Sequence, residues 1–168
     1  MQRRTLLKLG IGTATLLIVA GGGLALLRPG LNDGRLAPAG REVFHAVARA
    51  VLDGLLPADA GTRAAALQAH LKRVDDAIAA FPSATQAELS QLLALLGSAA
   101  GRIGLARLRI DWPDAGVSDV QHALQGMRTA SLDLRQQAYH ALRDLTNAAY
   151  FADAAAWPSM GYPGPKAL

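Results

Sequence analysis

The 168-residue sequence contains no cysteine. Without a thiol, the chain forms no disulfide, zinc–thiolate site, iron–sulfur cluster or covalent c-type haem attachment, and it has no cysteine nucleophile. Aromatic residues are also scarce at 5%, and charged residues make up 18%. Hydrophobic residues, mostly Ala and Leu, make up 51%, which is enough to bury the core of one domain and favours helices over sheet.

Acidic residues are missing from the first 28 positions, and this alone produces the net charge of +4. That segment contains Arg3, Arg4, Lys8 and Arg28, whereas the other 13 basic residues are balanced by 13 acidic ones. Binding to a phosphate backbone needs a basic patch, and the body of the chain shows none. We therefore expect no nucleic-acid partner.

The N-terminal segment has the layout of an export signal. A basic start is followed by the uncharged apolar residues 9–27, which several glycines and threonines dilute. The start resembles the twin-arginine (Tat) motif, Arg-Arg-x-hydrophobic-Leu-Lys. The matching residues are Arg3, Arg4, Leu6, Leu7 and Lys8. We expect the Tat translocase to export the chain to the periplasm.

The same segment would also serve as a membrane anchor, because 19 helical residues at about 1.5 Å each span roughly 28 Å. Small residues suited to signal peptidase occur at Gly23-Leu24-Ala25 and at Ala37-Pro38-Ala39. Both cleavage positions stay open. An uncleaved leader would tether the protein to the inner membrane.

Apolar residues at steps of three and four predict an all-α fold, a small bundle of four to five helices in residues 40–153. Residues 1–39 are expected to form a signal or anchor helix with a linker, and no alternating strand pattern is seen. Thr85 and Glu88 have the spacing of a capping box. The expected helices are one containing Phe44–Leu55, one containing Leu67–Phe81, one from near Ser83, a short piece from Ile103 to Ile110, one capped by Ser118, and one from about Ser131 to Ala152.

The C-terminal residues 154–168 differ in kind from the body. Three prolines and two glycines interrupt residues 156–165, which predicts an extended tail close to polyproline II. Trp157 and Tyr162 are costly to leave in water, so we expect them to pack onto the bundle or onto a partner.

Histidine is the only strong metal-ligand type besides the carboxylates, and its spacing indicates no metal site. His45, His70, His122 and His140 each lie on an expected helix without a second ligand at a metal-binding spacing. We expect exposed or partly buried histidines with local hydrogen bonds. A metal or haem ligand pair from two distant helices stays open.

No catalytic constellation is present either. Asp75 and Asp76 are adjacent on a helix and point about 100° apart, so they form no acid–base dyad and are expected on a solvated face. Nucleophile-elbow, dinucleotide and P-loop fingerprints are missing. We therefore assign no catalytic, cofactor-binding or metal residue to this chain.

Basic residues gather before one loop. Arg102, Arg107 and Arg109 precede Asp111 and Asp114. The arginines and aspartates neutralise one another across the turn, or the arginines pair with the acidic residues of a partner. Exposed pairs of this kind contribute only about 0–1 kcal/mol each.

The order of features along the chain resembles the gluconate 2-dehydrogenase subunit 3 family, the small subunit of bacterial membrane-associated flavin dehydrogenases. The resemblance spans nearly the whole chain, from the Tat leader to the tail. It is carried by Leu55-Leu56-Pro57-Ala58-Asp59, Asn147–Asp153, Trp157 and Gly161-Tyr162-Pro163-Gly164-Pro165.

The resemblance implies a non-catalytic subunit without its own cofactor. Its partner would be a large FAD-containing subunit of the glucose-methanol-choline (GMC) type that oxidises a sugar, sugar acid or alcohol. A multihaem cytochrome c subunit would accept the electrons. The Tat leader would export the signal-less flavoprotein as well, and the expected interface residues are Tyr150, Trp157, Gly161, Tyr162 and Pro163. The alternative is a membrane-tethered periplasmic helical protein that binds a non-covalent cofactor or small ligand.

Overall fold

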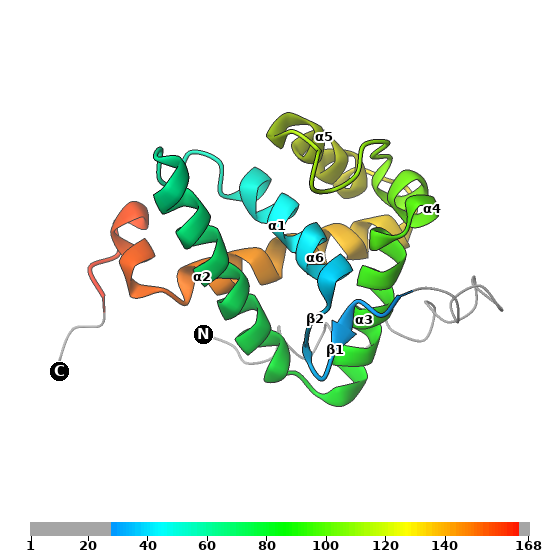
Figure 1. The fold of residues 1–168 in the computed structure, drawn as a ribbon, viewed down its shortest axis with the longest axis horizontal. Coiled ribbons are helices and arrows are strands. Elements are labelled where there is room, and N and C mark those ends of the chain that lie inside the picture. Colours follow the sequence, from blue (N-terminus) through cyan, green and yellow to red (C-terminus); the bar gives the residue numbers. More distant parts are fainter. Residues whose placement is uncertain (1–27, 165–168) are drawn as a thin grey trace.

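Six α-helices account for most of residues 28–164, the part of the chain that the computed structural model describes (Figure 1). The expected all-α class is confirmed. A two-stranded hairpin, a π-helical turn and a 3-10 helix complete the described residues. The helices are α1 (Pro38–Val51), α2 (Ala60–Ala79), α3 (Ser83–Gly97), α4 (Ala99–Gly101), α5 (Val117–Arg128) and α6 (Asp133–Phe151), with β1 (Leu31–Asn32), β2 (Arg35–Leu36), the π-helix η4 (Arg102–Ala106) and the 3-10 helix η5 (Ala154–Met160).

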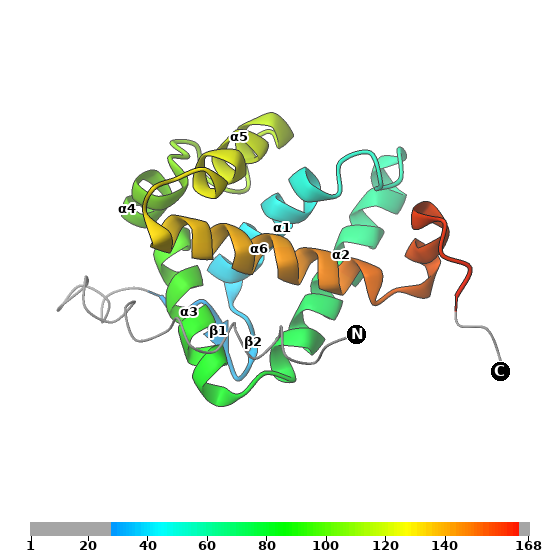
Figure 2. The same ribbon diagram turned by 180° about the vertical axis from the view of Figure 1, so that it is seen from behind.

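The central helix of the bundle is α1, which packs against α2, α3, α5 and α6. In Figure 1 it lies between α2 on one side and α3 and α5 on the other, and Figure 2 shows α6 crossing its opposite face. Val43 and Phe44 are fully buried, as is Val47 one turn further along the helix. Because α1 has neighbours on several sides, its buried surface is wider than the single stripe of a surface helix.

The hairpin β1–β2 occupies residues that the sequence suggested for the linker. Asp33 and Gly34 at its turn both have positive φ, 48° and 72°, which suits the twist of a two-residue hairpin loop. Leu31 and Leu36 pair across the strands and are 8% and 7% exposed, so both belong to the main core. With only two residues in each strand, no alternating pattern is long enough to reveal the hairpin in the sequence.

The body begins at Gly30. Its N–H donates to the Ser90 carbonyl of α3 at 3.2 Å, and a Cβ at this position would lie 2.3 Å from the Leu93 Cβ. A close approach of this kind requires glycine. Gly30 and the strand β1 are therefore held against α3, whereas β2 contacts α2 and α1.

Three helix ends differ from the sequence expectations. The first helix ends at Val51 rather than continuing to Leu55, and Gly54 follows with φ of 79°. Thr85 and Glu88 form no capping box, because α3 already begins at Ser83 and has no side-chain cap. In α5 the N-cap is Gly116 rather than Ser118. The Asp119 carboxylate supplies the capping interaction by accepting the Gly116 N–H at 3.0 Å.

A sharp corner joins α3 to the π-helix η4. The Ser98 hydroxyl accepts the Gly101 N–H at 3.0 Å, and a Cβ on Gly101 would clash with the Leu95 carbonyl. Trp112, in the following loop, is 2% exposed and donates its indole N–H to the Leu96 carbonyl at 2.8 Å.

Among residues 28–164, no single helix is long and apolar enough to cross a membrane. The helix α3 together with Ala99–Ala106 has the required length and composition, but these two segments are bent by 84° relative to each other.

Candidate functional site

The first part of the C-terminal segment is helical where an extended tail was expected. Residues 154–160 form the 3-10 helix η5, which Asp153 caps by accepting the Ala155 N–H at 3.0 Å. Only Pro158 lies inside this helix, and its fixed φ is compatible with helical backbone. Gly161 ends η5 with φ of 70°. The expectation of an extended segment is wrong for residues 154–160, which contain only one of the three prolines. The helix ends before residues 161–164, and residues 165–168 lie outside the described part of the chain.

Four of the expected interface residues surround one hollow at this end of the molecule. The rings of Trp157 and Tyr162 lie 5.4 Å apart at 58°, and Tyr162 is 46% exposed. The Trp157 indole N–H donates to the Phe151 carbonyl at 2.9 Å, which attaches the ring to the end of α6. The hollow measures about 240 Å³ and is lined by Ala154, Trp157, Pro158, Gly161, Tyr162 and Pro163.

Tyr150 belongs to a neighbouring hollow of about 200 Å³ instead. Its ring is half-buried and packs against a small apolar cluster that includes Leu52 and Leu67. Leu55, at the rim, is 47% exposed. The lining residues are Leu55, Leu56, Pro57, Ala66, Ala69, Arg73, Tyr150, Asp153, Ala155 and Ala156. We call the two hollows together the C-terminal surface, because both include residues of η5.

Arg73 of α2 fixes the position of this surface. Its Nε donates to the Ala149 carbonyl at 2.9 Å, and its Nη1 lies 3.1 Å from the Asp153 carboxylate. The same side chain therefore joins α2 to the last turn of α6 and to the cap of η5. Sequence reasoning missed Arg73, since 76 residues separate it from Ala149 and no local pattern marks it.

The loop 55–59 at the rim of the second hollow is also held firmly. The Arg63 guanidinium donates to the carbonyls of Pro57 and Ala58 at 2.8 and 2.7 Å. Asp59 caps α2 by accepting the Thr62 N–H at 2.8 Å, and this bond lowers the pKa of the Asp59 carboxyl. The rim of the hollow is therefore pre-organised.

The two hollows are better suited to protein side chains than to a cofactor. Sites for small molecules typically enclose about 300–1,000 Å³. Each hollow here is smaller and open to solvent, and neither is lined by a histidine. Among residues 28–164, no group of three or more His, Asp or Glu side chains is placed to hold a metal ion.

The four histidines differ in their exposure. His122 and His140 are exposed, and His45 is half-buried with a pKa lowered by burial and by the charge of Arg49. His70 corrects the expectation of local hydrogen bonds. It is 1% exposed, and neither ring nitrogen has a partner among the described residues. Burial, with a smaller effect of Arg73, lowers the pKa of His70 to about 4.

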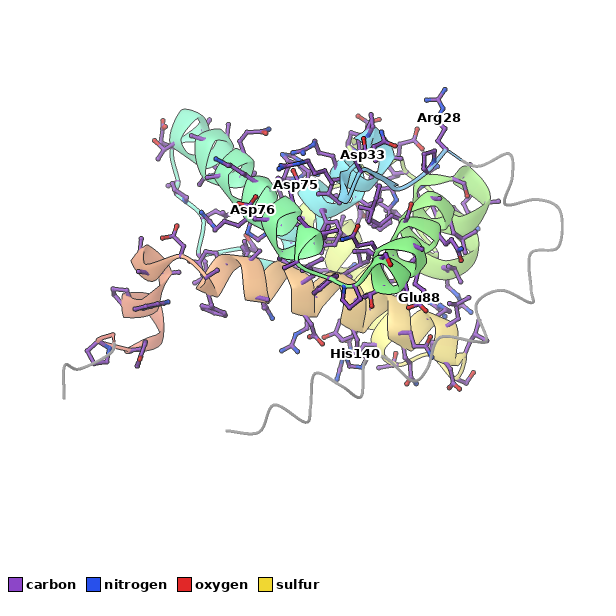
Figure 3. All side chains as sticks on the ribbon, turned by 90° about the horizontal axis from the view of Figure 1, so that it is seen from below. Arg28, Asp33, Asp75, Asp76, Glu88 and His140 are labelled. Atoms are coloured by element: carbon purple, nitrogen blue, oxygen red, sulfur yellow. The ribbon has the colours of Figure 1, made fainter. Side chains whose placement is uncertain are left out.

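Asp75 was expected on a solvated face, and that expectation was wrong. Its side chain is buried and points to the hairpin, whereas Asp76 is exposed (Figure 3). The Asp75 carboxylate accepts the Leu36 N–H at 2.8 Å and pairs with Arg41 at 2.6 Å. Asp75 therefore has a structural role, since it holds β2 against α2.

Only one of the three arginines in this cluster forms an ion pair with a described acidic residue. Arg102 is buried, pairs with Asp111, and donates to the carbonyls of Leu108 and Arg109. Arg107 and Arg109 are exposed and form no ion pair with any described acidic residue.

The Tat motif residues Arg3, Arg4, Leu6, Leu7 and Lys8 lie outside the described residues, as does the cleavage candidate Gly23-Leu24-Ala25. The other cleavage candidate lies within the fold. Ala37 is 3% exposed and precedes α1, whose first residues are Pro38 and Ala39. Cleavage after Ala39 would separate the hairpin from the bundle.

None of the protein families, curated proteins or solved structures compared with this chain matches it.

Proposed function

We propose that this chain is the non-catalytic small subunit of an exported FAD-dependent dehydrogenase of the GMC type. The observation that carries the proposal is the C-terminal surface, two small open hollows with an exposed aromatic ring beside them. Interfaces rely on a few aromatic anchors seated in pockets, and a pair such as Trp157 and Tyr162 has this character.

The chemistry of the partner follows from the resemblance of the sequence to the gluconate 2-dehydrogenase subunit 3 family. In this proposal the large subunit holds the FAD and oxidises a sugar, sugar acid or alcohol, and a multihaem cytochrome c receives the electrons. The small subunit supplies binding energy and the leader. A body without a recognisable cofactor motif then has a reason to carry a Tat signal, because Tat exports the folded flavoprotein with it.

The first test of the proposal is the double substitution Trp157→Ala and Tyr162→Ala in the tagged full-length chain. If each ring is an anchor worth about 2 kcal/mol, the loss weakens the complex several-hundred-fold. We expect the flavoprotein and its flavin absorbance to co-purify with the unchanged chain and not with the variant.

A matched control is Ile110→Ala, which removes a side chain that is 46% exposed, as Tyr162 is, outside the C-terminal surface. This variant should retain the flavoprotein. Circular dichroism should show unchanged helix content in both proteins. Full retention of the flavoprotein by the double variant would contradict the assignment of the surface.

The second test concerns export. Replacing Arg3 and Arg4 by Lys removes the twin-arginine pair while preserving both charges. We expect this chain and the flavoprotein to remain in the cytoplasm together, as measured by fractionation and flavin content. Arg28→Lys, outside the motif, is the control. Normal export of the flavoprotein beside a stranded small subunit would refute the escort role.

A further inference from the structure

Arg135, in the first turn of α6, is 8% exposed and lies between η4 and α5. Its Nε donates to the Leu105 carbonyl at 2.7 Å. On the other side, a Cβ on Gly126 of α5 would lie 3.6 Å from its Nη2, so the guanidinium is packed against a position without a side chain. The orientation of this guanidinium is therefore fixed by neighbours from two other segments.

The guanidinium of Arg135 is incompletely satisfied. Its Nη2 is buried and has no partner among the described residues. Its Nη1 has no hydrogen-bond partner there either, but it is not buried. A buried guanidinium donor without an acceptor is costly, and in a native protein such a group calls for an explanation, for example a functional role or a water or ion that supplies the acceptor.

The backbone beside Arg135 is unusual. Leu105, whose carbonyl it contacts, belongs to the π-helix η4, and Arg107 directly after η4 has φ of 55°. Single-turn π-helices and left-handed non-glycine residues are both concentrated at functional sites. The exposed Arg107 follows Leu105, the residue that Arg135 contacts, by two positions. Burial and, to a smaller extent, the charge of Arg107 lower the pKa of Arg135.

In the part of the chain that the structure describes, no side-chain carboxylate forms an ion pair with either of these two arginines. All 13 Asp and Glu residues lie between positions 33 and 153, and none of them forms an ion pair with Arg107 or Arg135. Residues 1–27 and 165–168 contain no acidic side chain. Asp111, which is nearby in sequence, already pairs with Arg102.

We propose that Arg107 and Arg135 form a binding site for an oxyanion, a carboxylate or phosphate group, at the junction of η4, α5 and α6. Guanidinium groups present parallel N–H donors that match the two oxygens of such a group. The first turn of α6 has no side-chain cap and adds the positive end of a 19-residue helix; its acidic residue, Asp133, forms no ion pair with either arginine.

The surroundings favour a carboxylate carried by a polypeptide over a free ion. Ile103 on η4 and Leu132 just before α6 are 50% and 54% exposed. Both lie on the segments that carry the two arginines, so a peptide side chain would find apolar as well as charged contacts. The proposed oxyanion site lies at the start of α6, whereas the C-terminal surface lies at the end of α6. The oxyanion site therefore does not depend on the proposed docking of the flavoprotein.

The Nε–Hε signal of Arg135 in the full-length chain tests the proposal directly by nuclear magnetic resonance. Sodium acetate, sodium phosphate and the peptide acetyl-Leu-Glu-Leu-amide are titrated against sodium chloride at equal ionic strength. We expect a saturable shift of this signal. Arg107→Gln should weaken the binding at least tenfold, and Arg109→Gln should leave it unchanged, since Arg109 is an exposed arginine without a proposed role.

The three probes distinguish the sources of the oxyanion. Tighter binding of the glutamate peptide than of acetate, and none of acetyl-Leu-Gln-Leu-amide, supports a polypeptide carboxylate. A response to phosphate alone supports the same site with a free phosphate group as its ligand. No response to any probe overturns the proposal, as does an equal loss of binding in Arg107→Gln and Arg109→Gln. Because Arg107 is exposed, its replacement keeps the test valid even if an Arg135→Met variant fails to fold.

Discussion

A chain that begins at residue 40 should be far less stable than one that begins at residue 28. The shorter chain lacks Leu31 and Leu36, whose burial contributes about 1.5–3 kcal/mol each. It also leaves the buried Asp75 carboxylate without the Leu36 N–H, a charge-assisted bond worth about 1.5–3 kcal/mol. The expected loss of at least about 4 kcal/mol is a large part of the 5–15 kcal/mol that stabilises a typical domain.

Urea unfolding followed by circular dichroism measures this difference. Within the full-length chain, Leu36→Ala should lower the free energy of unfolding by about 2–4 kcal/mol. The control Arg35→Ala removes an exposed side chain from the same strand and should change it by less than about 0.5 kcal/mol. Equal stability of the two truncated chains would contradict the assignment of the hairpin to the core.

This result bears on the processing of the leader. Of the two cleavage candidates, the one at Gly23-Leu24-Ala25 leaves the hairpin attached to α1, and the one at Ala37-Pro38-Ala39 removes it. If the truncation is as costly as expected, a protein cleaved after Ala39 would not retain its fold. We therefore expect any mature form to keep residues 30–39, and mass spectrometry of the exported protein measures its N-terminus.

The free energy of unfolding should fall as the pH is lowered from about 6.5 to 4, because His70 is buried without a hydrogen bond. The unfolded chain binds a proton at the ordinary pKa of 6.5, whereas the folded chain binds it only near 4. Above pH 6.5 the residue is neutral in both states and costs nothing. Between the two pKa values the unfolded state is favoured progressively, by about 3 kcal/mol in total.

His70→Leu separates this effect from the titration of the carboxylates. The variant should show a much flatter dependence of stability on pH between 6.5 and 4.5 than the unchanged protein. His140→Leu is the control, since His140 is exposed. His45, whose pKa is lowered in the same direction, leaves a small remaining slope in both variants. An unaltered slope in His70→Leu would show that another group governs the acid sensitivity.

The helices were predictable because their information is local. In α1, α2 and α6 the apolar residues return every three or four positions, and Pro82 marks the end of one helix and the start of the next. Trp157, Gly161, Tyr162 and Pro163 line one hollow, since these residues are near neighbours in the chain. Tyr150 lies in a different hollow, because the end of α6 turns before η5 begins.

Several features were missed because their partners lie far away in the sequence. Asp75 looked like a solvent-exposed acid until β2 and Arg41 were placed against it. Trp112 lies in a loop, and no local pattern indicates that its indole is buried against α3. The hairpin did leave one local signal, since Asp33-Gly34 between Leu31 and Leu36 has the form of a tight β-turn.

The sequence by itself determined the all-α class, the approximate helices and the composition of the C-terminal segment, because periodicity and proline positions act within a few residues of chain. The tertiary structure alone decided which polar side chains are buried, paired or left without a partner. The local sequence around His70, Asp75, Arg102 and Arg135 does not indicate that these polar side chains are buried. Arg102, Arg135 and Asp75 bond to residues that are 9, 30 and 39 positions away, respectively. Their burial and pairing therefore depend on how several helices pack together.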